Sequence, residues 1–121
     1  MKYLFIVITM IGLTSLTKVT SDEKYIKRNP IANSMQPSPG EQLIAKSDCI
    51  GCHKIDKKLI GPSYLDIAKK YPANDKSISY LSDKIIKGGS GVWGAIPMAP
   101  HSTMKKDDAK LIVKYILSLK K

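Results

Sequence analysis

The two cysteines of this chain lie three positions apart and are followed at once by a histidine, in the run Cys49-Ile50-Gly51-Cys52-His53. A disulfide across so short a loop would remove almost no conformational freedom from the unfolded chain, so a purely structural bridge is a poor explanation. Two thiols and an imidazole held this closely are reactive or ligating groups. Any fold of the chain therefore has to present these three side chains at one chemical site.

The N-terminal segment has the order of a secretory signal peptide. Lys2 precedes an uncharged apolar run, Tyr3–Leu16, and small and polar residues follow. The run is shorter than the ~20 residues that a membrane-spanning helix needs, which favours cleavage over insertion. We predict that residues 1–21 are a signal peptide cut after Val19-Thr20-Ser21, with Leu13-Thr14-Ser15 as a second cut site and an uncleaved membrane anchor as the alternative. The expected location is the periplasm.

The chain is basic, with 20 lysines and arginines against 10 acidic residues and a formal net charge of +10. Removal of the signal peptide takes away Lys2 and Lys18 and lowers this charge by two, to +8. A basic surface suits nucleic acid, anionic lipid or acidic proteins. Export, the scattered lysines and the lack of an aromatic platform argue against nucleic acid. Contact with a membrane is expected only if the N-terminal segment stays uncleaved.

One helical domain is expected after a flexible arm. Residues 22–37 contain two prolines and no sustained period, so we interpret them as an N-terminal arm. Residues 38–121 carry the apolar spacing of about four short helices, and no stretch alternates convincingly as a strand. The predicted fold class is therefore all-α.

The helix boundaries have local signals. Ser38-Pro39-Gly40-Glu41 combines a capping serine, a proline in the first turn and a glutamate three residues after the cap. A second helix follows Gly61-Pro62-Ser63 and ends before Pro72, and a third ends at Gly88-Gly89. The last helix is expected from about Lys106 to Leu119, with its apolar residues on one face.

A fourteen-residue segment, 88–101, separates the last two helices and is expected to have no regular structure. Irregular loops of this length in small domains are usually functional. The segment begins with glycines, is braced by Pro97 and Pro100, and contains the only tryptophan, Trp93. Four short helices bury a thin core, so we expect a large flat apolar group to complete it.

The cysteine run with its histidine matches the attachment of one haem. Two intervening residues let the sulfurs of Cys49 and Cys52 reach two vinyl groups, while Gly51 keeps the turn clear of the porphyrin and His53 lies under the metal. A thioredoxin-like dithiol would need a strand–helix–strand setting that is absent here. A zinc site normally needs four ligands, and His101 is the only other histidine. We therefore predict one covalently bound haem c, with its iron held by His53.

A sixth iron ligand is needed for electron transfer without binding of small molecules, and Met98 is the candidate. Methionines more often fill cores, but Met98 sits between two prolines that limit the freedom of the backbone. Met104 and Met35 are weaker choices. His101 is the alternative ligand, and it would give a lower reduction potential, because a thioether raises the potential.

These residues resemble the small bacterial class I cytochromes c, in particular the short soluble electron donors to nitrite reductases and terminal oxidases. The resemblance covers residues 40 to 121. It is carried by Cys49-Ile50-Gly51-Cys52-His53, Ile60-Gly61-Pro62-Ser63-Tyr64, Gly91-Val92-Trp93-Gly94, Ile96-Pro97-Met98 with Pro100, and Tyr115. It implies the class I cytochrome c fold, with about four short helices wrapped around one covalently attached haem.

The resemblance also implies roles for single residues. Cys49 and Cys52 would form thioethers, and His53 and Met98 would be the axial ligands. The carbonyl of Pro62 would brace the histidine from behind. The indole N–H of Trp93 would donate to a haem propionate, and Lys84 would place a cation near a propionate. The chain departs from the family pattern at Ala99 and His101, where a proline and an asparagine are common, and at Tyr115, where a tryptophan is common.

The expected function is one-electron transport between redox proteins outside the cytoplasm, with no catalytic residues and no enzymatic activity. The resemblance implies partners such as a cytochrome reductase complex and a terminal oxidase or nitrite reductase, and we expect a monomer. Lysines beside the haem-bearing segments would steer the carrier toward acidic patches: Lys54, Lys57, Lys58, Lys87, Lys105 and Lys106. The alternatives are a haem peroxidase or gas-sensing cytochrome with a displaceable sixth ligand, and a thiol oxidoreductase.

Overall fold

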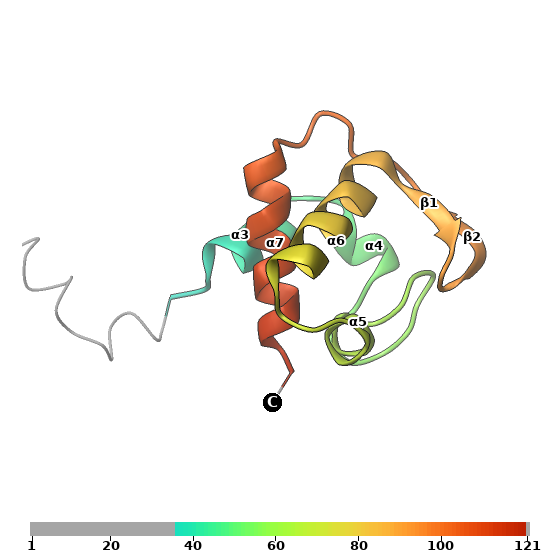
Figure 1. Ribbon diagram of the computed structural model, residues 1–121, viewed down its shortest axis with the longest axis horizontal. Helices are drawn as coiled ribbons and strands as arrows, with labels where there is room; N and C mark the ends of the chain where they lie inside the picture. The colour runs from blue at the N-terminus through green and yellow to red at the C-terminus, as the bar shows by residue number, and fades with distance from the viewer. Residues whose placement is uncertain (1–35, 121) are drawn as a thin grey trace, which may run out of the picture. The chain divides into compact units, whose positions relative to one another are not determined.

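The computed structural model describes residues 36–120, which fold into five helices and a two-stranded sheet (Figure 1). The predicted signal peptide, residues 1–21, and nearly all of the predicted arm lie outside the described residues. Within 36–120, no helix combines the length and apolar character required to cross a membrane. In chain order the elements are α3 (Pro39–Ala45), α4 (Cys49–Cys52), α5 (Tyr64–Lys70), α6 (Asp75–Lys87), β1 (Gly89–Gly91), β2 (Gly94–Met98) and α7 (Lys106–Ser118).

Three helices begin at side-chain caps that the sequence places there. The backbone N–H of Glu41 donates to Ser38 Oγ over 3.2 Å at the start of α3. Ser63 caps α5 in the same way, and Asn74 caps α6 by accepting from the N–H of Ser77 over 2.9 Å. A cap of this kind satisfies one of the N–H groups that a helix start leaves without a partner. The predicted starts near Ser38 and Ser63 are therefore confirmed.

Helix α7 forms the centre of the packing and contacts α3, α5 and α6. At the crossing with α3, a Cβ on Gly40 would lie 2.2 Å from the carbonyl oxygen of Leu111, so only glycine allows the two helices to approach this closely. The apolar face predicted for the last helix is buried in this cluster. The buried core consists of Ile44, Tyr64, Ile85, Ala109, Ile112, Val113, Ile116 and Leu117.

The predicted all-α class is confirmed as a mostly helical fold, but the prediction that segment 88–101 lacks regular structure is wrong. Strands β1 and β2 pair antiparallel, with Gly89 opposite Met98 and Gly91 opposite Gly94. The glycines permit this hairpin, since Gly89, Gly91 and Gly94 have φ values of 120°, 106° and 124° that other residues rarely adopt. The strands are short and almost fully exposed, so they carry no alternating apolar pattern from which to predict them.

The structure also separates the cysteines from the helix that begins after Ser38. Helix α3 ends at Ala45, and Cys49–Cys52 form a separate single turn, α4. The separation explains why there are five helices rather than about four.

Candidate haem-binding site

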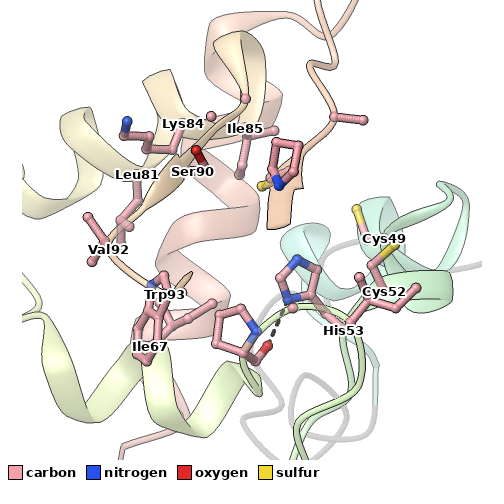
Figure 2. A pocket seen from close by; sticks show the side chains of 18 of the residues that line it. Cys49, Cys52, His53, Ile67, Leu81, Lys84, Ile85, Ser90, Val92 and Trp93 are labelled. Atoms are coloured by element: carbon pink, nitrogen blue, oxygen red, sulfur yellow. Dashed lines mark hydrogen bonds between the residues drawn. The ribbon is translucent and has the colours of Figure 1, made fainter. Parts of the chain in front are cut away.

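A cavity of about 620 Å³ lies between α4, α5, α6, the hairpin and α7. This volume is in the range of cofactor sites, ~300–1,000 Å³. All seven side chains predicted for the site line it, although they come from separate elements: Cys49, Cys52, His53, Pro62, Lys84, Trp93 and Met98. Figure 2 shows five of them by label around the cavity.

The two thiols lie at the two ends of the single helical turn α4. Both are free thiols; Cys49 is half-buried and Cys52 is exposed. The Oγ of Ser47 lies 3.0 Å from Cys49 Sγ. Figure 2 shows both cysteines on the same side of the site as His53. The arrangement leaves both sulfurs accessible for bonding to a group in the cavity.

His53 is held by its backbone and by its ring. Its N–H donates to the carbonyl of Cys49 over 2.9 Å, and ring Nδ1 lies 2.7 Å from the carbonyl oxygen of Pro62 (Figure 2). A carbonyl only accepts, so Nδ1 carries the proton and Nε2 keeps a free lone pair. Such a brace behind a histidine fixes the ring and its tautomer for metal binding.

Two neighbours confine the His53 ring further, and neither was predicted as a site residue. The ring of Tyr64 stacks on it, with 5.6 Å between ring centroids and 15° between the planes. A Cβ on Gly61 would lie 2.3 Å from His53 Cε1, so a side chain at this position would displace the ring. The resemblance pointed to this region through Pro62, whereas the turn and capping signals around Gly61 and Ser63 indicate a helix start rather than a contact with the ring.

Met98 ends β2 and is half-buried against the core. The backbone of Gly88 approaches it closely, because a Cβ there would lie 2.4 Å from the Met98 carbonyl oxygen. His101, the alternative ligand, lines the same cavity, but its Nε2 lies 2.9 Å from the carboxylate of Asp48. One of its two ring nitrogens is thus already paired. Met104 packs against the core and does not line this cavity.

Cations lie beside the aromatic part of the wall. The ammonium group of Lys70 is 5.2 Å from the ring centroid of Trp93, and that of Lys84 is 5.7 Å from the ring of Tyr80. Both distances are within the reach of a cation–π contact. Lys70 was not predicted, since nothing in its local pattern distinguishes it from other lysines on a helix end.

The cavity fits a large apolar group with a few polar edges. Three of its apolar side chains are strongly exposed, Ile96 by 69%, Ile60 by 54% and Val92 by 47%, as expected for a wall that a cofactor covers. Two buried polar atoms in the wall, Tyr64 Oη and His101 Nδ1, have no hydrogen-bond partner among the described residues. Burial also raises the pKa of the Tyr64 hydroxyl. Unpaired buried atoms of this kind indicate that a bound group or water completes the site.

Comparison with known proteins identifies the cofactor that the cavity fits. Residues 37–120 match the family described as Cytochrome c. The chain belongs to the cytochrome c family. It is 45% identical over 80 residues to cytochrome c-552 of Hydrogenobacter thermophilus, covering 66% of this chain and 81% of the relative. It is 39% identical over 83 residues to cytochrome c-551 of Pseudomonas denitrificans, covering 69% of this chain and all of the relative.

A solved structure of the same family has the same fold. The crystal structure of wild-type cytochrome c552 from Nitrosomonas europaea superposes with a TM-score of 0.61 at 46% sequence identity, covering 65% of this chain and 98% of that one. The chain is therefore a small monohaem cytochrome c of the class I type. Its cofactor is one covalently bound haem c with its iron, for which Cys49 and Cys52 stand in the attachment motif, and its role lies in electron transport.

Proposed function

We propose that this cytochrome c carries single electrons between redox proteins outside the cytoplasm, with His53 and Met98 as the two axial ligands of its iron. The observation that carries the proposal is the bond from His53 Nδ1 to the Pro62 carbonyl, which leaves Nε2 free in a cavity that Met98 also lines. The haem supplies the one-electron chemistry, since its iron alternates between the ferric and ferrous states.

The protein contributes a fixed set of contacts around that chemistry. Pro62 and Tyr64 keep the His53 ring from rotating, and Cys49 and Cys52 would hold the porphyrin by thioethers. The thioether of Met98 favours the ferrous state and raises the potential. The apolar wall excludes water, so little has to rearrange when the charge of the iron changes. None of these roles requires a catalytic residue.

The Trp93 indole N–H and the Lys84 ammonium group are proposed donors to the haem propionates. Both side chains line the cavity, and the cation of Lys84 would offset a propionate charge. We expect Lys84→Gln to lower the reduction potential, because it removes a positive charge near the iron, while Lys76→Gln on the exposed side of α6 leaves it unchanged. Equal potentials in these two variants would contradict the role of Lys84.

The ligand assignment is tested by the charge-transfer band between ferric iron and methionine sulfur. The wild-type holoprotein is expected to show this band, and Met98→Ala is expected to lose it. Met104→Ala is the matched control, because it removes a thioether that lies outside the cavity. A wild-type protein without the band would favour a peroxidase or gas-sensing cytochrome with a displaceable ligand.

Export is proposed from the N-terminal pattern, with residues 1–21 as a signal peptide, 22–37 as an arm and 38–121 as the cytochrome domain. The intact mass of the purified protein tests this proposal, because it reports both the length of the chain and the number of bound haems. Loss of residues 1–21 with one haem added is expected. A full-length mass would instead support the uncleaved membrane anchor.

The proposed partners are acidic redox proteins such as a cytochrome reductase complex and a terminal oxidase or nitrite reductase. The cytochrome is proposed to bind them as a monomer. The formal net charge, which is +10 for the full chain and +8 after the removal of Lys2 and Lys18 with the signal peptide, supports electrostatic steering to such partners. The rate at which the cytochrome reduces an acidic partner is therefore expected to fall as salt is raised. A rate that is equal at low and high salt would contradict the steering.

A further inference from the structure

His101 connects the segment after Met98 to two other parts of the fold. Its backbone N–H donates to the carbonyl of Ile85 on α6 over 3.0 Å, and its carbonyl accepts from the N–H of Met104 over 3.0 Å. The backbone is thus fixed on both sides, three residues beyond Met98. These bonds fix the point from which the imidazole ring extends.

The ring reaches across 53 positions of sequence to Asp48, with 2.9 Å between Nε2 and the carboxylate oxygen. Asp48 occupies the capping position of α4, yet its side chain makes no capping hydrogen bond. The carboxylate is therefore directed to His101 and not to the helix that it precedes. The hydrogen bond from His101 also lowers the pKa of the Asp48 carboxyl, which keeps it in the charged, accepting form.

The pair lies at the edge of the haem cavity. Asp48 and His101 both line this cavity and both line a shallower groove behind it, where Lys105 and Asp108 are the other charged residues. A carboxylate oxygen of Asp48, the sulfur of Cys49 and a ring nitrogen of His101 lie within 4.8 Å of one another. The pair thus joins the cysteine-bearing turn to the segment that follows Met98.

We infer that His101, through its bond to Asp48, is a positioning residue that holds the Met98 segment over the haem. On its other side, Met98 is anchored by the pairing of β2 with Gly89. Without the bond to Asp48, the backbone bonds of His101 to Ile85 and Met104 would remain, but the link from this segment to the cysteine-bearing turn would be lost. This inference rests on the proposed ligation by Met98.

The pair is unevenly exposed, which limits the size of its effect. The side chain of His101 is 19% exposed and that of Asp48 is 83% exposed. Exposed ion pairs contribute little to global stability. Loss of the bond between His101 and Asp48 is therefore expected to make local opening of the Met98 segment easier, and not to unfold the protein. We expect loss of the pair to favour replacement of Met98 by an external ligand by about two- to fivefold.

The test measures imidazole binding to the ferric holoprotein through loss of the iron–methionine charge-transfer band. His101→Ala and Asp48→Ser are each expected to lower the apparent dissociation constant of imidazole about two- to fivefold. The double variant is expected to match the single variants, because both remove the same bond. His101→Gln, whose amide nitrogen can reach the same carboxylate, is expected to restore the wild-type value.

Asp107→Ser is the matched control. It also removes one exposed acid, which pairs with Lys110 over 3.2 Å on α7, away from the cavity. An unchanged imidazole affinity in this control supports the assignment. Single effects that multiply in the double variant, or an equal change in the control, would overturn it. If the wild-type band is present and the His101 variants bind imidazole with the wild-type affinity, only this inference fails, whereas a missing wild-type band overturns Met98 ligation and the inference together.

Discussion

At the scale of residues, the His53 ring is positioned by groups that lie eight to eleven positions further along the chain. The Pro62 carbonyl accepts its Nδ1 proton, Tyr64 stacks on one face, and Gly61 leaves room for the ring. The resemblance to class I cytochromes c pointed to Pro62. The need for glycine at position 61 emerges only when the loop folds back onto the ring, because it depends on a contact and not on a local pattern.

Gly61→Ala is expected to destabilise the protein by about 1–3 kcal/mol, the usual cost of overpacking. The added methyl group would lie 2.3 Å from His53 Cε1, so the ring or the loop has to move. Denaturant unfolding of the ferric holoprotein measures the loss, and the visible spectrum reports on the ligand.

Ser79→Ala is the control for this substitution, because Ser79 is exposed on α6 and its hydroxyl makes no hydrogen bond among the described residues. It is expected to leave the free energy of unfolding nearly unchanged. If both variants unfold alike, the contact between Gly61 and the ring does not constrain the site.

At the scale of elements, local chemistry sets where the helices begin and end, while the hairpin depends on its surroundings. Asn74 caps α6, and Gly88 ends it with a φ of 69°. The hairpin that follows has no buried face of its own. Its strands form because the glycines permit the turn and because Met98 is held beside Gly88.

Asn74→Ala is expected to cost about 1 kcal/mol of stability, since it removes the acceptor for the Ser77 N–H. Asn74 is exposed, so the substitution leaves no cavity. Asn74→Ser keeps a capping oxygen and should retain most of the stability in thermal or denaturant unfolding. Equal losses in the alanine and serine variants would show that the cap contributes nothing.

The contact between α6 and α7 is expected to weaken in acid. Lys106 donates to the carboxylate of Asp83, and this hydrogen bond lowers the pKa of Asp83 below its ordinary value of 3.8. The unfolded chain then takes up the proton at a higher pH than the folded chain does. The stabilisation is therefore complete well above pH 3.8 and is lost as the pH falls through the lowered pKa.

The variant Asp83→Asn measures the stabilisation that the charged Asp83 side chain provides. Its stability is expected to lie below that of the wild type at neutral pH and to approach it as the pH falls below 3.8. Urea unfolding of both proteins across this range gives the comparison. A difference that stays constant with pH would show that the charge of Asp83 is not responsible.

At the scale of the whole molecule, the described residues form one apolar core around α7 and a cavity beside that core. The core is a single cluster of mostly aliphatic side chains, and a cavity of about 620 Å³ takes up the space that a larger core would fill. Domains of this size seldom fold on a small apolar core alone. The haem is therefore part of the core as well as the electron-carrying group.

A chain without covalent haem is expected to lose most of its helix. The double variant Cys49→Ala with Cys52→Ala cannot attach the cofactor, and its far-UV circular dichroism should fall toward that of an unfolded chain. Met98→Ala is the matched control, because it keeps both thioethers and should stay helical. A haem-free chain that retains the helical spectrum would show that the protein core suffices without the cofactor.

Local sequence was enough to establish the chemistry of the cysteine run and the starts of α3 and α5. Both depend on groups within a few residues of one another, as in the bond between Ser38 and the N–H of Glu41. Only the tertiary structure decided the hairpin, the contact of Gly61 with His53 and the bond between Asp48 and His101. These contacts join distant positions, and their energies exist only once α7 and the haem cavity have brought the segments together.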